Sequence, residues 1–359
     1  MAVFKNIHIS KFRGIRDLDV TDLKNINVFL GGNNVGKTTI LEAFFLLTGM
    51  SNPTLPMRIN NLRSKRLFAD SAIGQNMFLF YNVDTKNNPV FEANMSNDDF
   101  RRLSISLSDK QNTEKALLPN YVSVASSDEK HIGAECVVLN FEIKGKNDKT
   151  SKRYKSEFCT LNNGNVQQSI SNNYQEQILA QFIASSADPS TLTANISELI
   201  KAGKKSEIVE LIKLFDNRIV DLEALIDSVY IKYQGVKNLL PIDMCGEGLK
   251  KFLYIITGVA NGKNDILLID EIENGIHFSA YSLLWKSIFE LARKNKLQIM
   301  ITTHSKEVLT YLTTAINEEL LVDACLYSIT KGADENLYSY RYSGMDIVSA
   351  VDNNLELRD

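Results

Sequence analysis

The chain has 359 residues, 44% of them hydrophobic and 9% aromatic, with only 18 Gly and 6 Pro. This composition excludes a disordered or collagen-like protein and fits one large globular domain or two ordinary ones. The 40 Lys and Arg residues are balanced by 43 Asp and Glu residues, for a formal net charge of −3. A uniformly basic surface is therefore excluded, and any contact with DNA must be local.

The four cysteines, at 136, 159, 245 and 325, form no close pair, and there are only four His. We therefore expect neither a zinc site nor a disulfide framework, and we expect a cytoplasmic protein. The N-terminus alternates polar and apolar residues where a signal peptide needs a continuous apolar stretch. No window approaches the roughly 18 apolar residues of a membrane span, so no membrane partner is expected.

The first fifty residues predict strands, a glycine loop and a helix. Apolar residues alternate from Val3 to Val20 around Arg13-Gly14, which predicts two strands and a turn. A third strand at 26–30 runs into GGNNVGKTT and then into an apolar, helix-favouring segment that ends near Gly49.

Residues 51–165 are rich in Asn, Ser and Asp and contain the β-like runs MFLFYNV, RLSISL, CVVLNFEI and RYKSEFCTL. They predict an antiparallel β region. In the next segment, 166–229, apolar residues recur at three- and four-residue steps, as in RIVDLEALIDSV, which predicts a helical insert. The insert has too few heptads for a long coiled-coil arm. Strands ILLIDE and QIMITT, with a helix between them, and a last strand pair follow.

Residues 31–38 match the pattern G-x-x-x-x-G-K-S/T between a predicted strand and a predicted helix. Glycine is required there because backbone N–H groups must approach phosphate oxygens without a Cβ in the way. Lys37 is predicted to neutralise the β- and γ-phosphates of ATP, and Thr38 to hold Mg²⁺. The strand–loop–helix context argues against a chance glycine turn. The predicted nucleotide-binding residues are Gly31, Asn33, Asn34, Gly36, Lys37, Thr38 and Thr39.

Two further motifs each follow an apolar strand. Asp270 and Glu271 end the first strand, where Asp270 is predicted to reach Mg²⁺ and Glu271 to polarise the attacking water. His304 ends the next strand and is predicted to sense the γ-phosphate. Taken alone, an acidic pair or a His at a strand end is often only solvated or structural. The upstream P-loop favours the catalytic interpretation for both.

The segment Cys245-Gly246-Glu247-Gly248 precedes a predicted helix and resembles an anion site built from backbone amides. A glycine-rich helix entry without a ligand role is an equal alternative from this segment alone. The order of P-loop, glycine signature, Asp-Glu and His decides between them, because it is the order of ABC-type ATPases.

The sequence resembles the RecF- and OLD-like branch of ABC ATPases, which includes the AAA-type ATP-binding proteins of bacterial phage-defence loci. The resemblance rests on FRGI, NVFLGGNNVGKTTILEAF, GEGLKK, LLIDEIENGIH, TTHSKE and the final LELR. It implies an α/β fold: an ATPase head with a central mixed sheet flanked by helices, formed by residues 1–50 and 230–359, with an antiparallel β subdomain and a helical insert.

The resemblance also implies a homodimer that holds two ATP molecules, each between the P-loop of one protomer and the signature residues Gly246, Glu247 and Gly248 of the other. Arg13 is expected near the nucleotide, and residues 274–277 are expected to face the partner. Gln75 is a candidate for the glutamine that normally completes such a site. Cys245 departs from the serine of many signatures, and because a thiol is a weak donor, turnover is expected to be slow.

Two function classes follow. The first is an ATPase that regulates a separate effector, a nuclease or toxin, in anti-phage defence, since the residues after Ser305 are too few for the TOPRIM nuclease domain of relatives. The second is a DNA-repair ATPase of the RecF or SMC kind, for which Lys24 and the group Arg58, Arg63, Lys65, Arg66 offer little basic surface. A GTPase is disfavoured because Asn295-Lys296-Leu297-Gln298 lacks the Asp of its base-recognition motif.

Overall fold

The computed structural model describes residues 3–63, 74, 76–110, 134–161, 165–184, 189–225 and 228–353. Contacts within the chain divide it into two compact units. The first contains residues 1–5, 20–41 and 178–359, and the second contains residues 6–19 and 42–177. These units do not coincide with the predicted segments, because strand pairing joins residues that are distant in sequence. Strand β1 (Ile7–Phe12), for example, pairs with β4 (Val90–Asn94) in the second unit.

The first unit is built on a six-stranded sheet with the order β16-β15-β3-β14-β13-β9. Pairing is parallel from β9 to β15, and β16 is antiparallel to β15, so the sheet is mixed, as the sequence predicts. The strands are β3 (Ile26–Leu30), β9 (Ala180–Ile183), β13 (Ile266–Ile269), β14 (Gln298–Thr303), β15 (Ala324–Lys331) and β16 (Leu337–Ser343).

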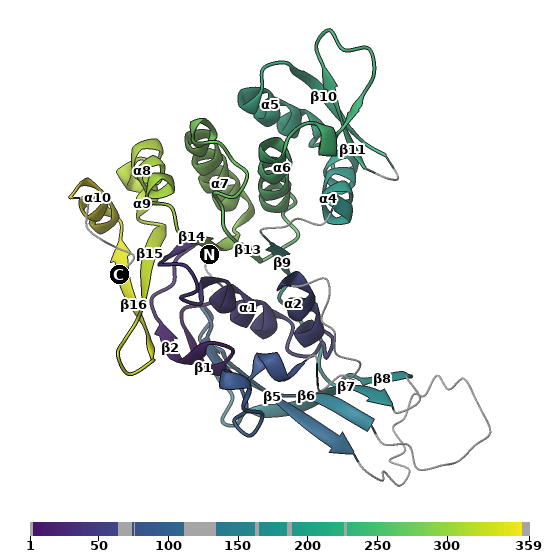
Figure 1. Ribbon diagram of the computed structural model, residues 1–359, viewed down its shortest axis with the longest axis vertical. Coiled ribbons are helices and arrows are strands. Elements are labelled where there is room, and N and C mark those ends of the chain that lie inside the picture. Colours follow the sequence, from purple (N-terminus) through teal and green to yellow (C-terminus); the bar gives the residue numbers. More distant parts are fainter. Residues whose placement is uncertain are drawn as a thin grey trace. The chain divides into compact units, whose positions relative to one another are not determined.

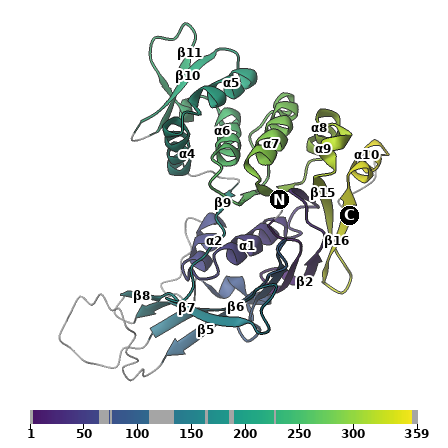
Figure 2. The same ribbon diagram turned by 180° about the vertical axis from the view of Figure 1, so that it is seen from behind.

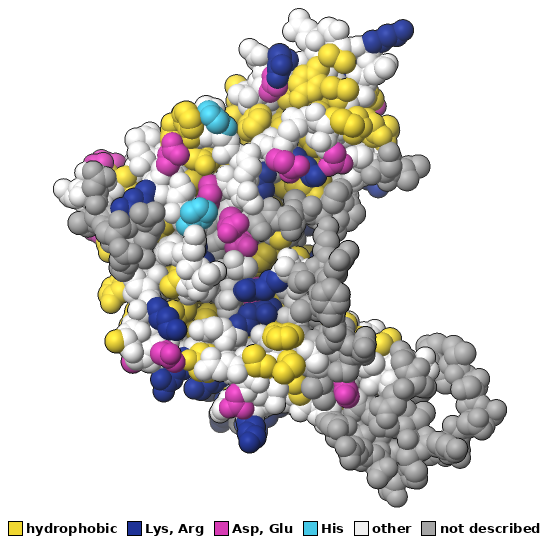
Figure 3. Space-filling view, viewed as in Figure 1, with side chains coloured by type: hydrophobic (Ala, Val, Ile, Leu, Met, Phe, Trp, Pro, Cys, Tyr) yellow, Lys and Arg dark blue, Asp and Glu magenta, His cyan; other side chains and the backbone are white. Residues whose placement is uncertain are grey.

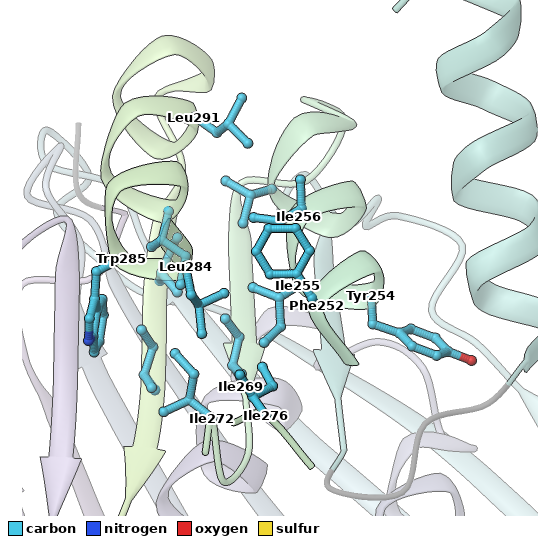
Figure 4. Close-up of a cluster of buried hydrophobic side chains, with 14 of the residues drawn as sticks. Phe252, Tyr254, Ile255, Ile256, Ile269, Ile272, Ile276, Leu284, Trp285 and Leu291 are labelled. Atoms are coloured by element: carbon cyan, nitrogen blue, oxygen red, sulfur yellow. The ribbon is translucent and has the colours of Figure 1, made fainter. Parts of the chain in front are cut away.

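Helices α4, α6, α7, α8 and α10 of this unit stand side by side in a row (Figures 1 and 2). Their apolar side chains meet those of the sheet, and in Figure 4 Phe252 and Ile255 of α6 and Leu284 of α7 gather near Ile269 at the end of β13. The helices are α4 (Pro189–Lys201), α5 (Lys205–Phe215), α6 (Glu247–Ala260), α7 (Tyr281–Asn295), α8 (Lys306–Ala315), α9 (Glu318–Leu321) and α10 (Met345–Asp352).

The segment predicted as a helical insert contains helices α4 and α5 but also strands. Residues 217–225 and 228 are not helical, because β10 (Ile219–Ala224) pairs with β11 (Val229–Tyr233), which in turn pairs with β12 (Leu240–Pro241). The register shifts between Ile219 and Asp221. Such a bulge turns Ile219 and Leu222, which are three positions apart, to the same buried face. The buried residues of this strand therefore have the three-residue spacing that is typical of a helix.

The second unit contains a seven-stranded sheet with the order β2-β1-β4-β5-β6-β7-β8, antiparallel from β1 onward. Its other strands are β2 (Ile15–Val20), β5 (Phe100–Lys110), β6 (Ala134–Lys144), β7 (Lys152–Leu161) and β8 (Val166–Ser169). Helix α1 (Lys37–Thr48) ends in this unit, and α2 (Leu55–Arg63) follows it.

One of the predicted β runs is wrong. MFLFYNV forms two short 3₁₀ helices, η1 (Met77–Leu79) and η2 (Tyr81–Val83), rather than a strand. Asn82 and Val83 have φ values of 51° and 60°, in the left-handed region that a continuous strand cannot contain.

The expectation that no disulfide forms is also wrong. Cys136 in β6 and Cys159 in β7 are bonded to each other and buried. The two residues are opposite each other in the antiparallel register although 23 positions separate them in sequence. Their spacing gave no sign of a pair, because only strand pairing brings them together.

None of the described helices has both the length and the apolar character needed to cross a membrane.

Candidate functional site

The predicted motifs meet at one edge of the six-stranded sheet. Strand β14 lies between β3 and β13, and all three run parallel. The carboxyl ends of parallel strands share one edge, so the loop after Leu30, the carboxylate Asp270 and His304 all follow that edge. The first unit therefore contains the whole of this cluster.

The loop at residues 31–36 has a backbone that few residue types could adopt. A Cβ at Gly31 would lie 2.6 Å from the Ile329 carbonyl oxygen, and Gly36 and Asn34 have φ values of 103° and 62°. Helix α1 begins immediately after the loop, at Lys37. Its first N–H groups have no partners within the helix, so the loop and the helix end can bind an anion.

Lys37 is buried beneath this loop. Its Nζ donates to the carbonyl oxygens of Gly31 at 2.9 Å and of Gly32 at 2.7 Å. Burial lowers the pKa of Lys37, and the nearby carboxylates of Glu273, Glu271 and Asp270 partly oppose that shift. Within the part of the chain that the structure describes, the ammonium group donates only to neutral carbonyls, so its charge is available to an anionic ligand.

Thr38 and Asp270 are in direct contact. The Thr38 hydroxyl lies 2.9 Å from Oδ1 and 3.1 Å from Oδ2 of the Asp270 carboxylate. Mg²⁺ is commonly bound by one or two protein oxygens together with substrate phosphates, and this pair offers such ligands. Among the described residues no group of three or more His, Cys, Asp or Glu could hold a metal ion by itself. The donor set therefore fits a Mg²⁺ that arrives with a phosphate ligand.

His304 is paired with a carboxylate that the sequence analysis did not select. Its backbone N–H donates to Glu273 Oε1 at 2.8 Å, and its ring Nδ1 lies 2.8 Å from the same oxygen. A carboxylate on Nδ1 places a proton on that nitrogen and leaves Nε2 for another partner. The Glu273 side chain is 9% exposed, and its Oε2 has no hydrogen-bond partner among the residues that the structure describes.

The signature segment begins helix α6. Gly246 has a φ of 93°, and a Cβ at Gly248 would lie 2.8 Å from the Gly275 carbonyl oxygen. The close approach of these two backbones explains glycine at 248. The Cys245 thiol lies 3.4 Å from the Pro241 carbonyl oxygen, and burial raises its pKa. The thiol is thus engaged within its own chain, consistent with its expected weakness as a donor to a ligand.

Comparison with models of protein families identifies the family of this chain. Residues 77–309 match the AAA ATPase domain family. This chain belongs to that family. The matched residues include Gly246, Asp270, Glu271 and His304, and the P-loop precedes them.

The chain is also similar to individual proteins and to a solved structure. Over 377 aligned residues the AAA ATPase chain is 25% identical to an ATP/GTP phosphatase of Helicobacter pylori, with 98% of each chain covered. It is 32% identical to an uncharacterized protein of Methanocaldococcus jannaschii over 94 residues, 26% of this chain and 81% of the relative. The crystal structure of an SMC head bound to the C-winged helix domain of ScpA has a TM-score of 0.50 at 11% identity, covering 97% and 99% of the two chains. The fold is thus a mixed α/β ABC-ATPase fold of the SMC-head kind.

The remaining predicted positions are Arg13, Gln75 and residues 274–277, and their roles toward a nucleotide or a partner stay predictions. Arg13 belongs to the second unit, where its Nε lies 2.8 Å from Glu42 Oε2 and its Nη2 donates to Asn60 at 2.9 Å. Burial lowers the pKa of Arg13 to about 10. Gln75 lies outside the described residues. Residues 274–277 begin in the turn at 272–275, which the Asn274 N–H closes by donating to the Glu271 carbonyl at 3.0 Å.

Sequence reasoning missed Thr302, Glu273 and Lys251. Lys251 on α6 is buried, and its Nζ donates at 3.1 Å to the carbonyl oxygens of Ala184 and Asp270. Burial lowers its pKa to about 8. A lysine three residues after GEG gives little sequence signal, since lysines are usually solvated. Lys251 ties the signature helix of this AAA ATPase to the end of β13.

Proposed function

We propose that this AAA ATPase binds ATP with Mg²⁺ at this edge of the sheet, hydrolyses it, and dimerises around it. The observation that carries the proposal is the contact of the Thr38 hydroxyl with both oxygens of the Asp270 carboxylate. The adjacent Lys37 is buried, and its ammonium group donates to backbone carbonyl oxygens. In the proposed site Lys37 neutralises phosphate charge, while Thr38 and Asp270 hold Mg²⁺, which offsets the charge that develops on the phosphate oxygens.

The remaining residues have separate roles in the proposal. Glu271 polarises the attacking water, and His304 presents Nε2 to the γ-phosphate while Glu273 fixes its ring. Gly246, Glu247 and Gly248 complete the site of a second protomer with the start of α6. The printed name of the Helicobacter relative, an ATP/GTP phosphatase, supports hydrolysis of nucleoside triphosphates.

We further propose that the dimer regulates a separate effector, a nuclease or toxin, in anti-phage defence, as the OLD-like resemblance suggests. The insert at about 172–229 is the proposed partner-binding surface, because it exposes large apolar side chains. Leu214 is 70% exposed and Val220 44%. Figure 3 shows hydrophobic side chains gathered over the region of α5 and β10. Exposed apolar patches of this kind often mark protein interaction sites.

A DNA-repair ATPase of the RecF or SMC kind is the second candidate, favoured by the SMC-head fold. The described basic side chains on the seven-stranded sheet support it less. Arg102, Lys146 and Arg153 each form an ion pair with a carboxylate of the same unit. Their charge is therefore partly cancelled before DNA could approach.

Sedimentation of a Glu271→Gln variant tests the dimer. The amide keeps the shape of the carboxylate but cannot act as a base, so bound ATP should persist and hold two protomers together. We expect a dimer with ATP and Mg²⁺ and a monomer without them. The double variant Lys37→Ala/Glu271→Gln is the matched control and should remain a monomer. Identical profiles for Glu271→Gln with and without bound ATP contradict the dimer.

Two experiments test the effector proposal. Repurified protein incubated with ATP, Mg²⁺ or Mn²⁺ and plasmid should leave the DNA intact. Two-metal cleavage needs several carboxylates around ions about 4 Å apart, and in our proposal Asp270 and Glu271 already serve ATP hydrolysis. We propose that this chain has no nuclease activity of its own, and cleavage that Glu271→Gln abolishes would contradict this. Co-expression with the product of the adjacent reading frame, followed by co-purification with and without ATP, tests the partner.

A further inference from the structure

Thr302 lies on β14 at the centre of the site, and its side chain is completely buried. Its hydroxyl oxygen lies 2.7 Å from Asp270 Oδ1 and 2.8 Å from the backbone nitrogen of Glu271. The Glu271 N–H can only donate, so the single hydroxyl proton of Thr302 is free to point to the carboxylate. One hydroxyl thereby bonds both residues of the Asp-Glu pair.

The backbone of Glu271 needs this support. Its φ is 46°, in the left-handed region that costs an ordinary residue roughly 1 kcal/mol or more. Thr302 binds this turn twice, since its carbonyl oxygen also accepts the N–H of Ile272 at 3.1 Å. Two consecutive N–H groups of the turn are thus satisfied by one residue of the neighbouring strand.

Packing does not explain a hydroxyl at this position. Every residue of β14 is buried, and the residues before Thr302 are Ile299, Met300 and Ile301. Valine has nearly the shape of threonine and would fill the same space in a strand without a polar group to satisfy. The hydroxyl therefore serves its two polar partners.

We infer that Thr302 is a positioning residue for ATP hydrolysis: its hydroxyl orients the Asp270 carboxylate toward Thr38 and holds the backbone from which Glu271 extends. This inference rests on the proposed roles of Asp270 and Glu271. Thr302 touches neither nucleotide nor water in the proposal and acts only through these two residues. Loss of such a supporting hydrogen bond beside a metal ligand typically costs about 10- to 100-fold in metal affinity or activity.

The test compares Thr302→Val, which keeps the shape, with Thr302→Ser, which keeps the hydroxyl. Steady-state hydrolysis is measured against ATP and Mg²⁺ concentration. We expect Thr302→Val to lower kcat about 10- to 100-fold and to need more Mg²⁺, with the KM for ATP changed only a few-fold. Thr302→Ser should retain most of the wild-type kcat.

A buried threonine elsewhere provides the control. The Thr257 hydroxyl on α6 donates only within its helix, to the Leu253 carbonyl at 2.7 Å and the Tyr254 carbonyl at 3.4 Å. Thr257→Val should hydrolyse ATP at the wild-type rate. If Thr302→Val does not fold, Thr302→Cys replaces it, and its weaker thiol donor should give a kcat below that of Thr302→Ser.

The outcomes separate two failures. Wild-type kcat and Mg²⁺ dependence in Thr302→Val or Thr302→Cys, with an active wild-type enzyme, overturns the positioning role alone. A loss in Thr302→Ser equal to that in Thr302→Val also overturns it, since the hydroxyl would then not matter. A wild-type protein that hydrolyses no ATP overturns the proposed function, and this inference with it.

Discussion

The two units differ in the groups that surround their buried charged side chains. In the first unit, Lys37 donates to backbone carbonyls, and Asp270 accepts from the hydroxyls of Thr38 and Thr302. In the second unit, buried charges face opposite charges: Arg101 binds both oxygens of Glu176 at 2.8 Å. Neutral partners leave net charge available to a ligand, whereas opposite charges cancel. The charges of Lys37 and Asp270 are therefore available to a ligand, whereas the Arg101–Glu176 pair is expected to stabilise the fold.

The largest effect should follow a change to the acidic pair of the first unit. Glu271→Gln should reduce ATP hydrolysis at least about 100-fold, because the amide cannot accept a proton from water. Asp270→Asn should instead raise the Mg²⁺ concentration needed for half-maximal rate. Arg101→Met, in the second unit, should leave the rate unchanged per folded molecule. A steady-state phosphate-release assay measures all three, and equal rates in wild type and Glu271→Gln would remove Glu271 from the mechanism.

Arg101→Met should instead lower the free energy of unfolding, by up to about 3–5 kcal/mol, because it leaves the largely buried Glu176 without its cationic partner. The adjacent Arg102 is a matched control. It pairs with Glu92 at 3.3 Å and its side chain is 45% exposed, so Arg102→Met should cost less than about 1 kcal/mol. Urea denaturation gives both values. Equal costs for the two variants would show that the buried pair is not structural.

Reduction of the Cys136–Cys159 disulfide should have a smaller effect, also confined to the second unit. Opening a cross-link between residues 23 apart in sequence should cost about 2–4 kcal/mol of stability, chiefly by freeing the unfolded chain. Urea denaturation with and without reductant measures the loss, and a Cys136→Ala/Cys159→Ala variant should show it without reductant. ATP affinity should be unaffected, so a reduced protein that no longer binds ATP would contradict the separation of the two units.

The sequence predicted the parts of the site that are local. The P-loop and the Asp-Glu pair are contiguous motifs whose chemistry depends on neighbours in the chain, and the mixed sheet was implied by the resemblance to ABC ATPases. Thr302, Glu273 and Lys251 were missed because each acts across strands or from a helix onto a strand end. A single sequence does not show which residues such packing brings together.

The same limit explains the errors in the fold. The disulfide depends on the β6–β7 register, and the strand at Ile219–Ala224 imitated a helix because its bulge changed the alternation of buried residues. In MFLFYNV the apolar run favoured a strand, but the left-handed Asn82 and Val83 broke it into short helical turns. Each error concerns tertiary pairing or backbone conformation rather than residue type.

Thermal melting with and without ATP and Mg²⁺, on the wild type and Lys37→Met, tests the central claim most directly. A ligand at about 100 times its dissociation constant adds about 2.7 kcal/mol to stability, which should raise the melting temperature of the wild type by several degrees. Lys37→Met should fold and melt without ATP but show no shift with it, because the charge aimed at the phosphates is gone. An equal shift in both proteins would contradict the assignment of this edge of the sheet as the ATP site.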